Sequence, residues 1–219
     1  MPQTTLASHE TYSGVTFKRL VMTHEIVKGA EFSECKFVRC DFSETAFQSC
    51  RFIECDFEDC TMKLTTVEGT TFARVRFSRC NLLGVNWTDA NWSEWATKLG
   101  SVAFEQCELK YAVFLGLKLS KLIMKDCNAQ EANFAEADLT EAEFAGTDFA
   151  SAIFLSTDLT RANFVGAQRY TLNLNDNRTQ GTRFSLPEAL RLLFALDIVI
   201  VDPDTHEDIA EDKIDDFIS

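Results

Sequence analysis

The chain has 219 residues, 46% of them hydrophobic, and a formal net charge of −13. This length fits one domain with a short appendage, and the apolar content is sufficient for a continuous core. No apolar run is long enough to span a membrane, and the segment MPQTTLASHETYSG lacks the regions of a signal peptide, so we expect a cytoplasmic protein. The acidic charge argues against direct nucleic-acid binding, which depends on Lys and Arg, and favours a partner with a basic surface.

After a predicted N-terminal cap or arm over residues 1–14, a bulky apolar residue returns at every fifth position. The first series runs from Phe17 to Trp92, and the second from Leu99 to Phe164. Phe fills most of these central slots. The predicted core Phe residues are Phe32, Phe37, Phe42, Phe47, Phe52, Phe57, Phe72, Phe77, Phe134, Phe144, Phe149 and Phe154.

A five-residue period matches neither the helical period of about 3.6 nor the strand period of 2. A lone helix or sheet would therefore scatter these residues over all its faces. A chain that turns a corner after every five residues instead points each central residue at one axis. Stacked coils then pair their backbones at the ordinary inter-strand spacing of about 4.8 Å.

The repeat carries a family resemblance. Ala132–Phe164 reads A-[ND]-[LF]-x-x almost without interruption, and the position two residues before each central slot is small. This pattern resembles the pentapeptide-repeat family. The resemblance implies an all-β solenoid, a right-handed quadrilateral β-helix with one pentapeptide per side and four per coil, which we place at residues 15–183.

The two series are out of phase by two residues, because seven residues separate Trp92 from Leu99. We therefore predict an insertion at about residues 93–103. It is either a tolerated bulge or a projection that contacts a partner, since loops on a rigid scaffold often carry function.

Outward residues twenty positions apart should stack in columns along the solenoid. With a two-residue bulge, one column reads Glu34, Glu54, Arg74, Glu94, Gly116, Glu136 and Ser156. Another reads Arg19, Arg39, Asp59, Arg79, Ser101, Lys121, Glu141 and Arg161. Such faces either keep a rod soluble or provide an acidic docking surface. The candidate partner contacts are Glu34, Glu54, Glu94, Trp95, Lys98 and Glu136.

No catalytic, metal or cofactor site is expected. All eight Cys residues fall two positions before a central slot, which is the small inward position, so we interpret them as core residues. No CxxC pair, Gly-rich phosphate loop or nucleophile motif is present. A filled solenoid also lacks the cleft that a catalytic site requires, so we expect a protein that is not an enzyme.

The pattern changes after residue 183. Ser185 and Glu188 form a capping-box pair before a helical apolar stripe. We predict a short C-terminal α-helix and an edge strand at Ile198–Val201 within residues 184–202, capping the last coil and joining a homodimer. The predicted dimer interface comprises Leu186, Leu190, Leu193, Phe194, Leu196 and Ile198. Residues 203–219 are expected to form a mobile acidic tail.

Two segments, Leu82–Trp92 and Arg183–Ile198, are similar to the topoisomerase-protecting branch of the pentapeptide repeats, which includes the Qnr proteins, MfpA and the albicidin-immunity protein AlbG. This resemblance implies a DNA-mimicking homodimer that binds DNA gyrase or topoisomerase IV and protects it from quinolones or toxin inhibitors. The alternative is a non-enzymatic solenoid scaffold that binds another protein.

Overall fold

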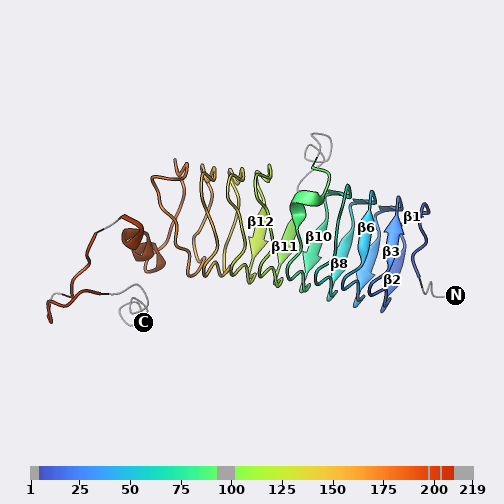
Figure 1. Cartoon of the computed structure of the whole chain (residues 1–219), viewed down its shortest axis with the longest axis horizontal. Coiled ribbons are helices and arrows are strands. Elements are labelled where there is room, and N and C mark those ends of the chain that lie inside the picture. The colour runs from blue at the N-terminus through green and yellow to red at the C-terminus, as the bar shows by residue number, and fades with distance from the viewer. Residues whose placement is uncertain (1–4, 93–101, 197, 203, 210–219) are drawn as a thin grey trace.

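The computed structural model describes residues 5–92, 102–196, 198–202 and 204–209. The chain winds into coils that stack along one axis, with the N-terminal coil at one end and the C-terminal helix beyond the last coil (Figure 1). The predicted β-solenoid is confirmed. Within the described ranges, no helix is both long and apolar enough to cross a lipid bilayer.

Parallel strands of three residues line successive coils. One sheet contains β1 (Thr11–Ser13), β4 (Glu31–Ser33), β7 (Arg51–Ile53) and β9 (Thr71–Ala73). A second contains β2 (Thr16–Lys18), β5 (Lys36–Val38), β8 (Asp56–Glu58), β10 (Arg76–Ser78), β11 (Ala103–Glu105) and β12 (Ile123–Lys125). A third pairs β3 (Ile26–Lys28) with β6 (Ala46–Gln48). Isolated parallel bridges continue the same pairing to Arg183, so successive coils remain in register as far as that residue.

Stacked aromatic rings fill the axis of the solenoid. Phe17, Phe37, Phe57 and Phe77 lie in one column with ring centroids 4.5 to 5.0 Å apart. Rings from neighbouring columns meet edge to face, as Phe52 does with Phe47 at 5.3 Å. All twelve Phe residues assigned to the core are buried. Because one side chain type fills one slot in successive coils, the same ring packing repeats along the rod.

The corners of the coils need a left-handed backbone conformation. At most central slots among the described residues, the residue two positions later adopts it, for example Glu34 with φ of 55°. At Gly146, with φ of 71°, a side chain would also collide with the carboxylate of Asp126 in the preceding coil. Other corners adopt this conformation without glycine, so what distinguishes Gly146 is the space it leaves for the Asp126 side chain.

The small inward positions join neighbouring coils by hydrogen bonds. Thr65 and Thr70 each donate a hydroxyl hydrogen bond of 2.8 Å to a carbonyl 23 residues earlier. The Cys55 thiol makes the same kind of contact, 3.4 Å from the carbonyl of Phe32. These positions therefore combine small volume with satisfaction of polar groups inside the core.

The insertion is longer than the sequence interpretation allowed. Phe77 pairs with Phe104, 27 residues later, where an uninterrupted coil needs 20. One side of this coil therefore holds seven extra residues, and the predicted two-residue bulge is wrong. The insertion follows Trp92. Just before it lies η1, a 3₁₀ helix at Trp87–Asp89, and the indole N–H of Trp92 donates to the carbonyl of Trp87 at 2.7 Å. Residues 93–101 lie outside the described part of the chain.

The solenoid starts earlier than residue 15. Strand β1 lies inside the expected arm and pairs with β4, and Tyr12 fills a central slot against Phe32 with ring centroids 5.1 Å apart. Leu6 is buried as well. Tyr12 is as large and flat as the Phe residues of later coils, so it extends their stack by one coil.

The C-terminal helix differs from its prediction. It is η2, a 3₁₀ helix at Glu188–Leu196, and the capping box does not form. Ser185 Oγ instead accepts the backbone N–H of Gly166 at 3.1 Å, and Glu188 accepts that of Arg169 at 3.1 Å. Both N–H groups belong to the last coil, where no further coil supplies carbonyl partners. The two side chains therefore cap the solenoid rather than the helix.

The predicted edge strand at residues 198–201 is absent. Val201 instead makes a single antiparallel bridge with Asp208, and the N–H of Ile209 bonds the carbonyl of Ile200 at 2.8 Å. Asp202 organises the turn between them by accepting the N–H groups of Asp204 and Thr205. The start of the expected tail thus folds back on the segment before it, because the turn offers the backbone partners that the solenoid does not.

Candidate protein-binding surface

Outward charges on the N-terminal half of the rod are largely paired across coils. Arg51 contacts Glu31 at 3.2 Å, and Arg79 holds Asp59 at 2.7 Å. The pKa of Asp59 is lowered, first by its hydrogen bond from Arg79. Other acids here, such as Glu34 and Glu68, have no cation partner among the described residues, but Lys and Arg are nearly as numerous as acids, so this half carries little net charge.

The negative charge is unevenly distributed along the chain. Residues 185–219 contain 10 of the 34 acidic residues but 2 of the 21 basic ones, so residues 1–184 carry −5 of the net −13. Within the solenoid, residues 126–160 hold eight acidic residues and no Lys or Arg. We call this segment the acidic band.

Flanking coils neutralise half of the acidic band. Glu131, Glu141, Asp148 and Asp158 each have a Lys or Arg partner from a neighbouring coil. Burial alone would raise the pKa of Asp148, but hydrogen bonds from Arg169 and Gln130 lower it. Among the described residues, no cation pairs with the other four carboxylates, which are Asp126, Glu136, Asp138 and Glu143.

The free charge of the acidic band is locally dense. At twenty residues per coil and about 4.8 Å per coil, residues 126–160 span about 8 Å of the axis. Four unpaired carboxylates over that length give one charge per about 2 Å. Duplex DNA carries one per about 1.7 Å of its axis. The band therefore approaches the linear charge density of DNA, whereas the rest of the rod does not.

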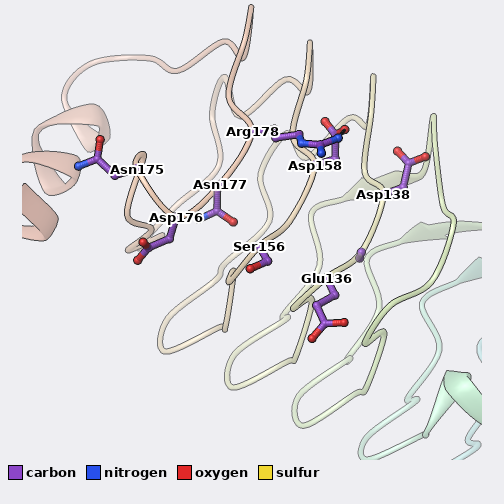
Figure 2. Close-up of a pocket in the computed structure, with 9 residues that line it drawn as sticks. Glu136, Asp138, Ser156, Asp158, Asn175, Asp176, Asn177 and Arg178 are labelled. Atoms are coloured by element: carbon purple, nitrogen blue, oxygen red, sulfur yellow. Dashed lines mark hydrogen bonds and ion pairs between the residues drawn. The ribbon is translucent and has the colours of Figure 1, made fainter.

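A hollow of about 570 Å³ lies at one corner of this region. Two rows of side chains from successive coils line it, and Figure 2 shows Glu136, Ser156 and Asp176 in one row. Asp138, Asp158 and Arg178 form the other, with Arg178 beside Asp158 at 3.4 Å. The hollow is open and polar, and its free groups are acids, so it suits a Lys or Arg side chain better than an apolar ligand.

Comparisons with known proteins agree with this architecture. Models of the pentapeptide repeat region and of eight-copy pentapeptide repeats match residues 30–99 and 127–166, together half of the chain. The chain belongs to the pentapeptide-repeat family. Comparison with curated proteins finds no match.

Two solved structures of this family have the same fold over most of the chain. Both are trypsin-treated variants of QnrB1, described as a plasmid-mediated fluoroquinolone resistance protein. Each is 17% identical to this chain and is covered over 98% of its length. They cover 89% and 88% of this chain, with TM-scores of 0.59 and 0.60. At this identity the likeness establishes the fold alone, so function has to be inferred from the surface of this chain.

The predicted contact residues of this pentapeptide-repeat protein do not form one face. Glu34 is exposed, and Glu54 is engaged by Arg74 in the next coil. Glu136 lies on a different side, because the seven-residue insertion shifts every later residue around the coil. Its N–H bonds Leu155, and its column continues to Ser156 and Asp176, as Figure 2 shows. Glu94, Trp95 and Lys98 lie outside the described residues.

The same shift reassigns the second predicted column. Arg79 is followed by Gln106 and Asp126, whereas Lys121, Glu141 and Arg161 continue the column of Glu54 and Arg74. Sequence reasoning therefore missed Asp126, Asp138 and Glu143 as surface acids. A local count of charge over each coil would have found them.

The eight cysteines lie buried in the core. Burial raises the pKa of Cys55 to about 12 and also raises that of Cys50. Reactive cysteines have lowered pKa values and partial exposure, so Cys50 and Cys55 have the character of inert packing residues. Among the described residues, no group of three or more His, Cys, Asp or Glu side chains could hold a metal ion.

The residues assigned to a dimer interface lie at the end of the rod. Leu186 is 76% exposed and Ile198 is 50% exposed. Leu190 and Leu193 are also exposed, whereas Phe194 and Leu196 are half-buried. The neighbouring Leu192 is buried against the solenoid core. Helix η2 therefore uses one face to cap the last coil and leaves apolar side chains on another.

Proposed function

We propose that this protein is a non-catalytic mimic of duplex DNA that binds DNA gyrase or topoisomerase IV in the cytoplasm and protects it from quinolones or toxin inhibitors. The observation that carries the proposal is the acidic band, in which free carboxylates follow the axis at about the linear charge density of DNA. A topoisomerase binds DNA through basic surfaces, and the acidic band offers such a surface a locally similar field.

Two further features support the proposal. Leu82–Trp92 and Arg183–Ile198 resemble the topoisomerase-protecting branch of the family, and QnrB1, which shares the fold, is described as a fluoroquinolone resistance protein. The exposed apolar residues of the C-terminal end favour a homodimer joined there. Since the acidic band lies close to that end, the two bands of a dimer would flank the joint and lengthen the anionic surface.

A gyrase supercoiling assay tests the proposal. Purified gyrase is inhibited by ciprofloxacin or by albicidin, and increasing amounts of the full-length protein are added. Restored supercoiling with at least one inhibitor is expected. No rescue with either inhibitor, together with no binding to gyrase or topoisomerase IV at low salt, would contradict it. Recovery of a different stoichiometric partner in a pull-down would favour the alternative of a scaffold for another protein.

A further inference from the structure

One side of the C-terminal coils combines exposed leucines with an acidic edge. Leu115 is 43% exposed and Leu155 is 52% exposed, while Ala135 between them is 8% exposed. The hydrogen bonds of Gly116 to Ala135 and of Glu136 to Leu155 place the three residues in successive coils of one column. Two leucines thus project on either side of a small residue, which leaves a notch between them.

A second column on the same side strengthens the apolar character. Val113, Asn133 and Ile153 are joined by parallel bridges, and Ile153 is 49% exposed. The residues between the two columns are the buried central ones, such as Phe134. The exposed face is therefore a mainly aliphatic strip, interrupted by Asn133, that no described part of the chain covers.

The edge of this strip is acidic. Glu136 follows the Leu115 column directly, and Asp176 stands two coils further along the same corner, lining the hollow shown in Figure 2. Neither carboxylate has a cation partner among the described residues. An apolar strip beside free carboxylates complements a segment that presents leucines on one face and Lys or Arg along its border.

The spacing of the strip fits a helix. Leu115 and Leu155 are two coils apart, which is about 10 Å at the spacing of stacked strands. Residues seven apart in an α-helix rise by about 10 Å, and a residue three or four positions along falls midway. A helix lying parallel to the rod axis would therefore place successive apolar residues against Leu115, the notch at Ala135, and Leu155.

We propose that this strip, formed by Leu115, Ala135, Ile153 and Leu155 with the acidic edge at Glu136 and Asp176, binds a cationic amphipathic helix of a protein partner. Binding uses apolar contact as well as charge. It therefore persists in part when salt screens the carboxylates, which a purely electrostatic contact does not. The proposal does not depend on the partner being a topoisomerase.

Fluorescence anisotropy with a defined probe tests this surface. The probe is a labelled helical peptide of Leu and Lys with Leu at every third or fourth position, added to the full-length protein. The control peptide keeps the Leu positions and replaces Lys with Glu. We expect the Lys peptide to bind at least about tenfold more tightly than the Glu peptide at low salt, because like charges would meet at the acidic edge.

Matched variants separate the two components of binding. Replacing both Leu115 and Leu155 with Ser should weaken binding at least about tenfold at low and high salt, because two apolar contacts are lost. Val165→Ser, the same repeat position on another side, should change it less than about twofold. Ser occupies this position at Ser33 and Ser78, so the substitutions suit the fold.

The edge variant combines Glu136→Gln and Asp176→Asn. It should weaken binding several-fold at low salt and less at high salt, where the carboxylates are already screened. Equal affinity for the two peptides, unchanged binding by the Leu115 and Leu155 double variant, or complete loss of binding at high salt would each overturn the proposal. Gyrase is absent from the assay, so failure here leaves the supercoiling test independent.

Discussion

Phe52→Ala measures how strongly the aromatic core holds the solenoid together. Phe52 is fully buried, stacks on Phe32 at 4.7 Å and on Phe72 at 5.4 Å, and meets Phe47 and Phe57 edge to face. Truncating a buried Phe to Ala costs about 3–5 kcal/mol through lost burial and the cavity left behind. The coils above and below pair by backbone hydrogen bonds at fixed spacing, so they cannot close the cavity. We therefore expect about 4–5 kcal/mol, the upper part of that range.

Urea unfolding followed by circular dichroism gives the free energy of unfolding for this comparison. Phe52→Leu is the matched core control and should cost about 1–2 kcal/mol, because most of the volume is kept. Leu64→Ala, at an exposed corner, should change the free energy by less than about 0.5 kcal/mol. A cost below about 1 kcal/mol for Phe52→Ala would refute a core built from stacked central residues.

Three further predictions concern the C-terminal end and pH. Replacing Leu190 and Leu193 together with Asp should give a monomer by light scattering with an unchanged circular dichroism spectrum, and a persistent dimer would place the interface elsewhere. Because the pKa of Asp148 is lowered in the folded state, its carboxylate stabilises the fold above the ordinary Asp pKa of about 3.9, and this stabilisation is lost as pH falls through the folded value. The urea midpoint of Asp148→Asn should therefore depend less on pH between about 5 and 2 than that of the unsubstituted protein. Tyr170 has a buried hydroxyl without a hydrogen-bond partner among the described residues, and burial, with the Glu188 charge adding to it, raises its pKa to about 12. Tyr170→Phe should change stability by less than about 1 kcal/mol at pH 7 and reduce the loss of stability as pH rises from about 10 to 12; a larger loss in the variant would contradict this assignment.

The fold could be predicted from the sequence because one physical requirement repeats. A bulky residue every five positions, with a small residue two before it, is compatible with a chain that turns four corners per coil. The prediction needed no knowledge of which residues touch. The column of Phe17, Phe37, Phe57 and Phe77 follows directly from that period.

The surface could not be predicted as well, because it depends on register across the insertion. Trp92 and Leu99 each fit the pattern of a central residue, so spacing alone counts them as two successive sides. The pairing of Phe77 with Phe104 shows one side with extra residues instead. That error leaves every residue of the later core inward but moves Glu136 to another face. Core predictions are insensitive to such a shift, whereas surface columns depend on it completely.

The sequence correctly marks Ser185 and Glu188 as hydrogen-bond acceptors, but it predicts the wrong donors for them. Ser185 and Glu188 have the spacing of a capping box, and both do accept backbone N–H groups. The last coil offers N–H groups that no further coil can satisfy, and these compete with those of the helix. A sequence pattern identifies a hydrogen-bond acceptor, but the open end of the solenoid decides which donor it meets.

Binding of purified gyrase to the acidic-band variant tests the central claim most directly. The variant carries Asp126→Asn, Glu136→Gln, Asp138→Asn and Glu143→Gln, and the amides keep the hydrogen-bond acceptors of the carboxylates. The control carries the same change of charge at exposed acids outside the band, namely Glu10, Glu25, Glu34 and Glu68 replaced by Gln. We expect the band variant to lose at least about tenfold in affinity at low salt and the control less than about threefold. Equal affinity of the two variants for gyrase would contradict DNA mimicry by the acidic band.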